Sequence, residues 1–214
     1  MDSPATPRKR RKDARPNELL AAALDLFVEK GYSATRLEDV ATRAGASKGT
    51  LYLYFANKEA LFKAVIEEGI IPVIAENETI AAEHTGSAFA LMERLIYNWW
   101  EKIGQTAYSG IPKLMVAEAR NFPELAQFYY EKVILRARAL GTQALQYGMR
   151  SGEFRTVDLD TALDVIIAPI IMLLILRHSL YGGPEHGPDP SSYLKTHLQL
   201  LAHGLLKLDK ETQV

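Results

Sequence analysis

The run GASKGTLYLYF, residues 45–55, concentrates side chains that bind phosphate oxygens. Lys48 supplies an ammonium group, and Thr50, Tyr52 and Tyr54 supply hydroxyl groups, all within about two turns of a helix. These groups, together with the N-terminus of a helix, bind phosphate well. The chemistry that this run predicts is recognition of an anion, which is either a nucleotide or a nucleic-acid backbone.

A nucleotide site is excluded by the order of the residues. A phosphate-binding loop has the pattern G-x-x-x-x-G-K-[ST] and follows a buried strand. In this sequence Lys48 precedes Gly49, and the upstream segment VATRA has a helical pattern. The run is therefore expected to be a short helix.

The two sides of this short helix differ in character. At about 100° per residue, Leu51 and Phe55 point toward a core, with Tyr54 at its edge. The outward side is formed by Gly49, Thr50, Tyr52 and Leu53, with Lys48 at the amino end. An outward glycine permits close approach of a partner, and an outward leucine fits against a thymine methyl group in the major groove. A solvated helix with half-buried tyrosines is the alternative, but the glycine and the two tyrosines favour DNA.

Capping signals define the helices that position this run. Thr35-Arg36-Leu37-Glu38 has the pattern of a capping box, in which Thr35 caps a second helix and Glu38 reaches back to the exposed amide. That helix is expected to end at Ala44, and Gly45 then supplies a turn. Because two capped helices with a glycine turn between them follow a first helix, the sequence predicts a helix-turn-helix unit.

The neighbouring helices have equally clear ends. Ser47 is expected to cap the third helix, which runs to about Phe55, and Asn57 to cap a fourth. The first helix is expected to open near residues 13–16 and to stop before Gly31. Further helices are expected at residues 87–103, 112–120, 123–149, 158–181 and 193–208.

The predicted fold class is all-α, with about nine helices in all. An N-terminal three-helix helix-turn-helix domain, residues 13–60, precedes a larger helical domain for ligand binding and dimerisation, residues 61–214. Residues 1–12 are expected to be a disordered basic arm. The basic run 8–12 admits three interpretations: a solvated tail, an arm that contacts the DNA minor groove or backbone, and a nuclear-localisation signal.

Composition is that of a globular protein, with 214 residues, 48% hydrophobic residues and a net charge of −1. Residues 1–60 carry 11 Lys and Arg against 8 Asp and Glu, a net charge of +3, so the remainder carries −4. This asymmetry between the two parts indicates an N-terminal surface that meets an anion. There is no signal-peptide pattern, and the apolar run 165–176 is shorter than the roughly 20 residues that span a bilayer. A cytoplasmic protein without a membrane partner is expected.

Catalytic and metal-binding patterns are not found in the sequence. It has no cysteine, its five histidines are scattered, and no H-E-x-x-H, G-x-S-x-G or G-x-G-x-x-G motif occurs. We therefore expect neither an enzyme nor a metal site, and no cofactor.

The run from about Asn17 to Val65 closely resembles the DNA-binding domain of the TetR family of transcriptional regulators. The resemblance rests on the Leu/Ala/Phe first helix, Gly-Tyr, Thr35, Val40-Ala41, Ala44-Gly45, SKGTLY, Tyr54-Phe55 and Lys58-Glu59. It covers about fifty residues without a gap. The remaining residues are similar to the family only in helical character and length. Ala46 and Arg36 depart from the residues that the family often has at these positions.

The resemblance implies a bacterial homodimer that places two recognition helices in successive major grooves of a palindromic operator. It implies DNA contacts from the residues at Thr50, Tyr52, Tyr54 and Lys58. Contacts from Thr35 and Arg36 at the start of the second helix, and from Arg43 at its end, are also expected. A repressor released by a small-molecule effector is the expected function; the alternative is a helical protein-interaction module that does not bind DNA.

The C-terminal domain is expected to hold the dimer interface and an effector pocket. The helices at 158–181 and 193–208 would form the interface, the first being apolar nearly all round and interrupted or kinked by Pro169. A monomer core is the alternative for these helices. The large or charged side chains that we expect at a pocket are Trp99, Met115, Arg120, Phe128, Tyr129 and Met172.

Overall fold

The computed structural model describes residues 7–182 and 186–207, with side chains from Pro16 onward. Its α-helices are α1 (Pro7–Lys30), α2 (Leu37–Arg43), α3 (Lys48–Tyr54), α4 (Lys58–Gly69), α5 (Ile71–Glu83), α6 (Ala88–Trp99), α7 (Ile111–Glu118), α8 (Pro123–Tyr129), α9 (Leu135–Ser151), α10 (Leu159–Arg177) and α11 (Pro190–Leu205). Two π-helical turns, η1 (Trp100–Gly104) and η3 (Tyr130–Ile134), and one 3₁₀ turn, η2 (Ala107–Gly110), join them. The described residues contain no β-strand, so the prediction of an all-α chain is confirmed.

Several of these helices continue one another. Only Ile70 separates α4 from α5, and its backbone stays in the helical region. The stretch from α8 through η3 to α9 is unbroken from Pro123 to Ser151. When these are joined, nine helical rods remain within the described residues, which is the number expected.

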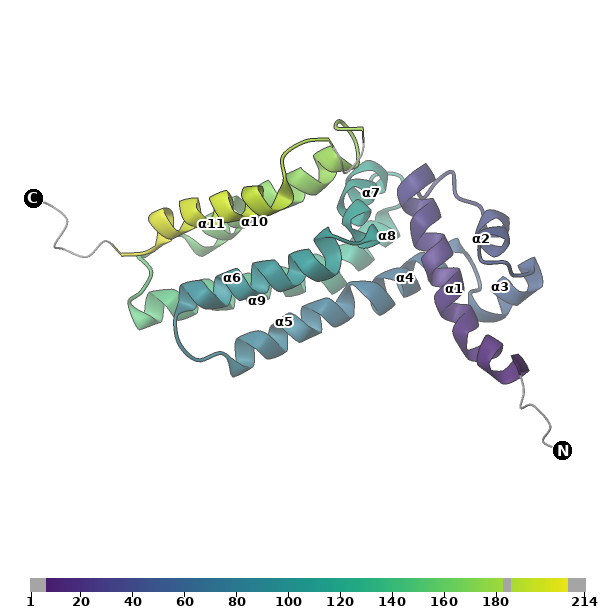
Figure 1. Ribbon diagram of the computed structural model, residues 1–214, viewed down its shortest axis with the longest axis horizontal. Coiled ribbons are helices and arrows are strands. Elements are labelled where there is room, and N and C mark those ends of the chain that lie inside the picture. Colours follow the sequence, from purple (N-terminus) through teal and green to yellow (C-terminus); the bar gives the residue numbers. More distant parts are fainter. Residues whose placement is uncertain (1–6, 183–185, 208–214) are drawn as a thin grey trace, which may run out of the picture.

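Figure 1 shows an elongated molecule with α1, α2 and α3 at one end. The long helices α5, α6 and α9 extend away from that end, and α10 and α11 lie along one side of them. The short helices α7 and α8 lie where the two parts meet, and α7 packs on both α1 and α10. The N-terminal helices are thus supported by α4, α7 and the turn η2, all of which pack on α1.

The first helix begins earlier than predicted. Residues 7–12, expected to belong to a disordered arm, are helical and continue directly into the rest of α1. Lys and Arg are good helix formers, so this basic run extends an existing helix at little cost. Pro16 lies inside α1 without ending it. Residues 1–6 of the expected arm lie outside the described residues.

One hydrophobic core joins the N-terminal helices to the rest of the chain. It includes Leu19 and Phe27 of α1, Phe62 of α4, Met115 of α7 and Leu125 of α8, all of them buried. The core therefore crosses the predicted domain boundary between residues 60 and 61. Because close-packed interiors transmit displacements, the two parts are mechanically connected.

Helix α10 is not interrupted at Pro169, contrary to one of the two expectations for it. Side chains of α11 donate hydrogen bonds to carbonyl groups near this proline. The Tyr193 hydroxyl donates to the Pro169 carbonyl at 3.1 Å, and His197 Nε2 donates to the Ile166 carbonyl at 2.9 Å. These two bonds pin α11 against α10.

By length and composition α10 is the one described helix that could cross a membrane, and 28% of its most apolar window is buried within the chain. Val165 and Met172 are exposed on it, and Leu200 is exposed on α11. The chain therefore leaves an apolar surface uncovered along its α10–α11 side.

The start of α6 is capped by a side chain distant in sequence. Glu153 accepts hydrogen bonds from the Ala88 amide at 2.6 Å, the Phe89 amide at 3.0 Å and the Ser87 hydroxyl at 2.6 Å. Burial opposes ionisation of this carboxyl, but the three donors outweigh it and lower the pKa of Glu153. The carboxylate thereby fastens the end of α9 to the start of α6.

We predict that Glu153→Gln lowers the free energy of unfolding by about 1–2 kcal/mol at neutral pH, since it removes charge-assisted hydrogen bonds. Because the folded-state pKa is depressed, the stabilisation is complete above the ordinary Glu pKa of about 4.3 and is lost as the pH falls below it. Urea unfolding at pH 7 and pH 3.5 measures this. Glu83→Gln, at an exposed position on α5, is the control. A difference between wild type and Glu153→Gln that persists undiminished at low pH would contradict the assignment.

Candidate nucleic-acid interface and internal cavity

Helix α3 presents the face that the sequence predicted. Leu51 and Phe55 are buried, whereas Gly49, Tyr52 and Tyr54 are exposed. Leu53 is the most exposed large apolar side chain described, at 82%. Leu53 together with the neighbouring exposed rings of Tyr52 and Tyr54 forms an apolar and aromatic surface that suits contact with a partner.

Local hydrogen bonds fix both ends of the turn before α3. Gly45 has φ +60°, a conformation that glycine adopts without strain. The Ala46 amide bonds to the Ala41 carbonyl at 2.8 Å and closes α2. Ser47 accepts from the Thr50 amide at 3.0 Å, so its predicted capping role is confirmed, as is that of Asn57 at the start of α4.

Lys48 lies at the amino end of α3 and pairs with Glu38 of α2 at 2.5 Å. Its ammonium also lies over the Tyr52 ring, 5.8 Å from the centroid. The hydrogen bond to Glu38 raises the pKa of Lys48, so the group remains a cation. The pair is exposed, and a phosphate group can therefore compete with Glu38 for Lys48.

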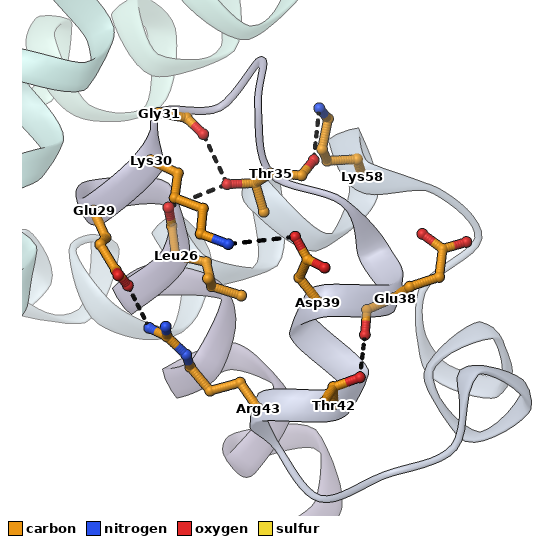
Figure 2. Close-up of polar contacts among 10 residues, drawn as sticks. All are labelled: Leu26, Glu29, Lys30, Gly31, Thr35, Glu38, Asp39, Thr42, Arg43 and Lys58. Carbon is orange, nitrogen blue, oxygen red and sulfur yellow. Dashed lines mark hydrogen bonds and ion pairs between the residues drawn. The ribbon is translucent and has the colours of Figure 1, made fainter.

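The predicted capping box at Thr35 is wrong. Arg36, not Thr35, is the N-cap residue of α2, and no side chain caps the helix. Figure 2 shows the Thr35 hydroxyl directed toward α1, where it lies 2.7 Å from the Gly31 carbonyl and 3.1 Å from the Leu26 carbonyl. Thr35 is only 2% exposed, so its side chain cannot contact DNA as expected. The hydroxyl therefore donates to two carbonyls on its N-terminal side and does not accept from an amide of α2.

The ammonium group of Lys58 is also fully engaged by contacts within the protein. Its ammonium donates to the carbonyls of Tyr32 at 2.7 Å, Ser33 at 3.1 Å and Thr35 at 3.0 Å, and it lies 4.5 Å from the centroid of the Tyr32 ring. An ammonium has three donor hydrogens, so this geometry leaves none for the phosphate contact that the resemblance implied. Burial lowers the pKa of Lys58, and the nearby Glu118 opposes that shift.

The remaining cations predicted to contact DNA lie on α2 and at its start. Arg43 pairs with Glu29 of α1 at 2.6 Å, and Lys30 pairs with Asp39 at 3.5 Å (Figure 2). These ion pairs hold α2 against α1. Arg36 is exposed beside the start of α2. The exposed outer face of α3, with Lys48 at its amino end, is therefore the candidate surface for a DNA groove.

A cavity of about 900 Å³, partly open to solvent, occupies the C-terminal part of the chain. Its walls come from the α4–α5 junction, α5, α6, η1, α7, α8, η3, α9 and α10. This volume lies near the upper end of the roughly 300–1,000 Å³ range of ligand pockets. Most of the lining is aliphatic or aromatic.

Three of the six residues expected at a pocket line this cavity, namely Trp99, Met115 and Tyr129. The others do not. Arg120 is exposed beyond the end of α7, and Met172 is 51% exposed on the outer side of α10. Phe128 packs against the N-terminal core with Lys63 above its ring, because adjacent helical residues point about 100° apart.

Sequence reasoning missed the residues that connect the cavity to the N-terminal helices. Glu118, near the cavity-lining Met115 and Ala119 on α7, accepts a hydrogen bond at 3.0 Å from the Ser33 amide in the turn between α1 and α2. Ile70 at the α4–α5 junction lines the cavity and belongs to the N-terminal core. Glu118 and Ser33 are 85 residues apart, and no local pattern relates them.

No cluster of three or more His, Cys, Asp or Glu side chains that could hold a metal occurs in the part of the chain that the structure describes. The arrangement instead combines an exposed helix suited to a DNA groove with a largely apolar cavity that is partly open to solvent, joined by a shared core.

Comparisons with known proteins agree with this geometry. Residues 19–65 match the family model for bacterial regulatory proteins of the tetR family, and residues 82–181 match the tetracycline repressor-like C-terminal domain. The chain is 31% identical over 204 residues to the uncharacterised HTH-type transcriptional regulator YfiR of Bacillus subtilis, a match covering 89% of this chain and 95% of that protein. The chain belongs to the TetR family of transcriptional regulators.

Other TetR regulators are similar over most of this chain. The repressor KstR2 of Rhodococcus jostii is 31% identical over 71% of this chain and 73% of its own. The crystal structure of the regulator FadR of Bacillus subtilis, in complex with stearoyl-CoA, has a TM-score of 0.73 at 23% identity and covers 88% of this chain and 98% of that one. The latter likeness shows the shared fold.

Proposed function

We propose that this TetR regulator is a repressor that binds a palindromic operator as a homodimer and is released when a small molecule occupies its cavity. The observation that carries the DNA-binding half is the outer face of α3, where Leu53, Tyr52 and Gly49 are exposed on a helix that Ser47 caps. Hydroxyl groups and the helix N-terminus suit phosphates, and Leu53 suits a thymine methyl group. The name of the relative KstR2 supports repression.

Selection of the purified protein against a randomised duplex pool is expected to enrich a palindrome. The variant Thr50→Ala, Tyr54→Ala should bind that palindrome about 10- to 100-fold more weakly, because two hydroxyl contacts to charged phosphates are lost. Fluorescence anisotropy at fixed salt measures the affinity.

The matched control is Thr79→Ala, Tyr97→Ala, which removes the same side chains at exposed positions on α5 and α6. It should bind as wild type does. Absence of any enriched duplex, even after refolding to remove bound small molecules, would contradict DNA binding and favour a protein-interaction module.

The dimer is proposed to form through α10 and α11. These helices leave Val165, Met172 and Leu200 exposed, although they pack tightly on their inner side. An apolar surface of this kind is stabilised when a second copy covers it, and two such helix pairs about a two-fold axis form a self-complementary interface.

We predict that Val165→Lys, Leu200→Lys converts the protein from dimer to monomer, since the interface would bury two unpaired ammonium groups from each copy. Sedimentation at micromolar concentration measures the mass. Leu53→Lys, an exposed leucine on α3, is the control and should remain dimeric. If the wild type is a monomer, or if the Val165→Lys, Leu200→Lys variant remains a dimer, this interface is wrongly assigned.

Effector binding is proposed to reach α3 through α7 and α4. Met115 and Ile70 belong both to the cavity wall and to the N-terminal core. Glu118 of α7 holds the Ser33 amide, and Lys58 of α4 holds the carbonyls of the same turn. A ligand that displaces α7 or the end of α4 therefore changes the support of α1 and α2, on which α3 rests. Such coupling is a free energy shared by the two sites and acts in both directions.

This reciprocity allows a test before the natural effector is identified. Nile red, an uncharged dye that fluoresces in apolar surroundings, serves as the cavity probe. Saturating operator should weaken Nile red binding to wild type by roughly 5- to 150-fold, the usual range of allosteric coupling. In the Glu118→Ala variant, which lacks the hydrogen bond to the Ser33 amide, the factor by which operator weakens Nile red binding should fall toward one.

Glu101→Ala, an exposed acidic position, is the control and should keep the wild-type factor. The same factor in Glu118→Ala and wild type would remove Glu118 from the coupling route. No effect of operator on wild type would contradict release by an effector.

A further inference from the structure

The chemistry of the cavity wall restricts the class of molecule that it binds. Among its lining residues, Arg138 and Asp164 are the charged ones, and they form an ion pair with each other. Arg138 also pairs with Asp160 at 3.5 Å. Both carboxylates are largely exposed. The charged groups therefore lie at the rim and are already paired, with acidic groups in excess.

The other polar side chains of the lining are also mostly engaged or at the rim. Asn77, which is buried, donates to the Leu95 carbonyl at 3.3 Å and accepts from the Asn98 amide at 2.8 Å. Gln127 is exposed and bonds to Glu131. Tyr130 is also exposed. None of these residues is arranged to neutralise a charged group inside the cavity.

Two lining side chains, Tyr129 and Trp99, differ from them, because no hydrogen bond within the described residues engages the Tyr129 hydroxyl or the Trp99 indole N–H. The Tyr129 hydroxyl can be removed by a substitution that keeps the ring. Every fully buried polar side-chain atom among those residues does have a partner, so this hydroxyl is not sealed in protein but open to the space that it lines. Burial of the ring raises the pKa of Tyr129, so the phenol stays protonated and remains a donor. A donor in an apolar cavity is satisfied by water when the cavity is empty and by an acceptor on a bound molecule.

We infer that the cavity binds an uncharged, mainly apolar molecule whose carbonyl or ester oxygen accepts a hydrogen bond from the Tyr129 hydroxyl; this rests on the proposal that the cavity is the effector site. A free carboxylate is disfavoured, because it would lose its hydration without gaining a cation. A wholly apolar molecule would leave the Tyr129 donor without a partner.

Three probes with the same chain length separate these cases: 2-tridecanone, tridecane and tridecanoate, each measured by displacement of Nile red. On wild type, 2-tridecanone should bind more tightly than tridecanoate. Tyr129→Phe should weaken 2-tridecanone about five- to tenfold, the effect of one hydrogen bond. The same substitution should change tridecane binding less than about twofold, since tridecane has no acceptor.

Two further variants control the experiment. Tyr130→Phe removes the neighbouring hydroxyl at the rim and should leave all three affinities unchanged. Ala137→Phe places a ring at a cavity-lining position of α9 and should weaken every probe that enters the cavity. Circular dichroism confirms that each variant is folded.

The inference is overturned if tridecanoate binds more tightly than 2-tridecanone, if Tyr129→Phe leaves 2-tridecanone unchanged, or if no probe displaces the dye. Operator affinity is measured separately with and without 2-tridecanone. If Tyr129 discriminates the probes but the operator affinity does not change, the ligand class of the cavity stands and the effector role of the proposed function fails.

Discussion

The ammonium group of Lys58 holds together the turn between α1 and α2, and the positions of α2 and α3 depend on this turn. Three backbone carbonyls of the turn between α1 and α2 converge on it, and the Tyr32 ring covers it. The Thr35 hydroxyl in this turn already donates to the Gly31 carbonyl. The other backbone carbonyls of the turn therefore need a hydrogen-bond donor from elsewhere. Because Lys58 is the first residue of α4, the start of that helix is tied to the turn that positions α2, and through α2 to α3. The orientation of the recognition helix is thus set by contacts outside it.

The same turn is held from the other side by Glu118 of α7. Its two supports, α4 and α7, both reach the cavity, through Ile70 and Met115. Under the proposed function, an apolar ligand would act on the core that carries α1 rather than on α3 directly. A molecule bound among α6, α9 and α10 would then change DNA binding without contacting the exposed face of α3. The occupied and empty states would differ in packing, which behaves as a switch between discrete arrangements.

Local signals in the sequence predicted what local interactions determine. The caps Ser47 and Asn57 act on residues three positions away, and both were predicted correctly. Thr35 carries an equally good local signal, but the carbonyls of Leu26 and Gly31 take its hydroxyl, and those contacts depend on how α1 packs. The cavity residues were likewise predicted only by residue type. Trp99 and Tyr129 line the cavity, whereas Phe128 is of the same type but lies on the side of its helix that faces the N-terminal core. Glu118 could not be found, since only the tertiary fold brings it to Ser33.

The central claim, that occupancy of the cavity moves the recognition helices, is tested most directly by a distance between the two protomers of the proposed dimer. The chain has no cysteine, so Ala56→Cys, at an exposed position after α3, gives one spin-label site per protomer. On operator DNA, the pulsed electron resonance spectrum should give one narrow distance distribution, consistent with recognition helices separated by about 34–36 Å, one turn of DNA. Saturation of the free protein with 2-tridecanone should shift the centre of the distribution away from the operator-bound value. The same distribution in both states, with the cavity shown to be occupied, would contradict the account.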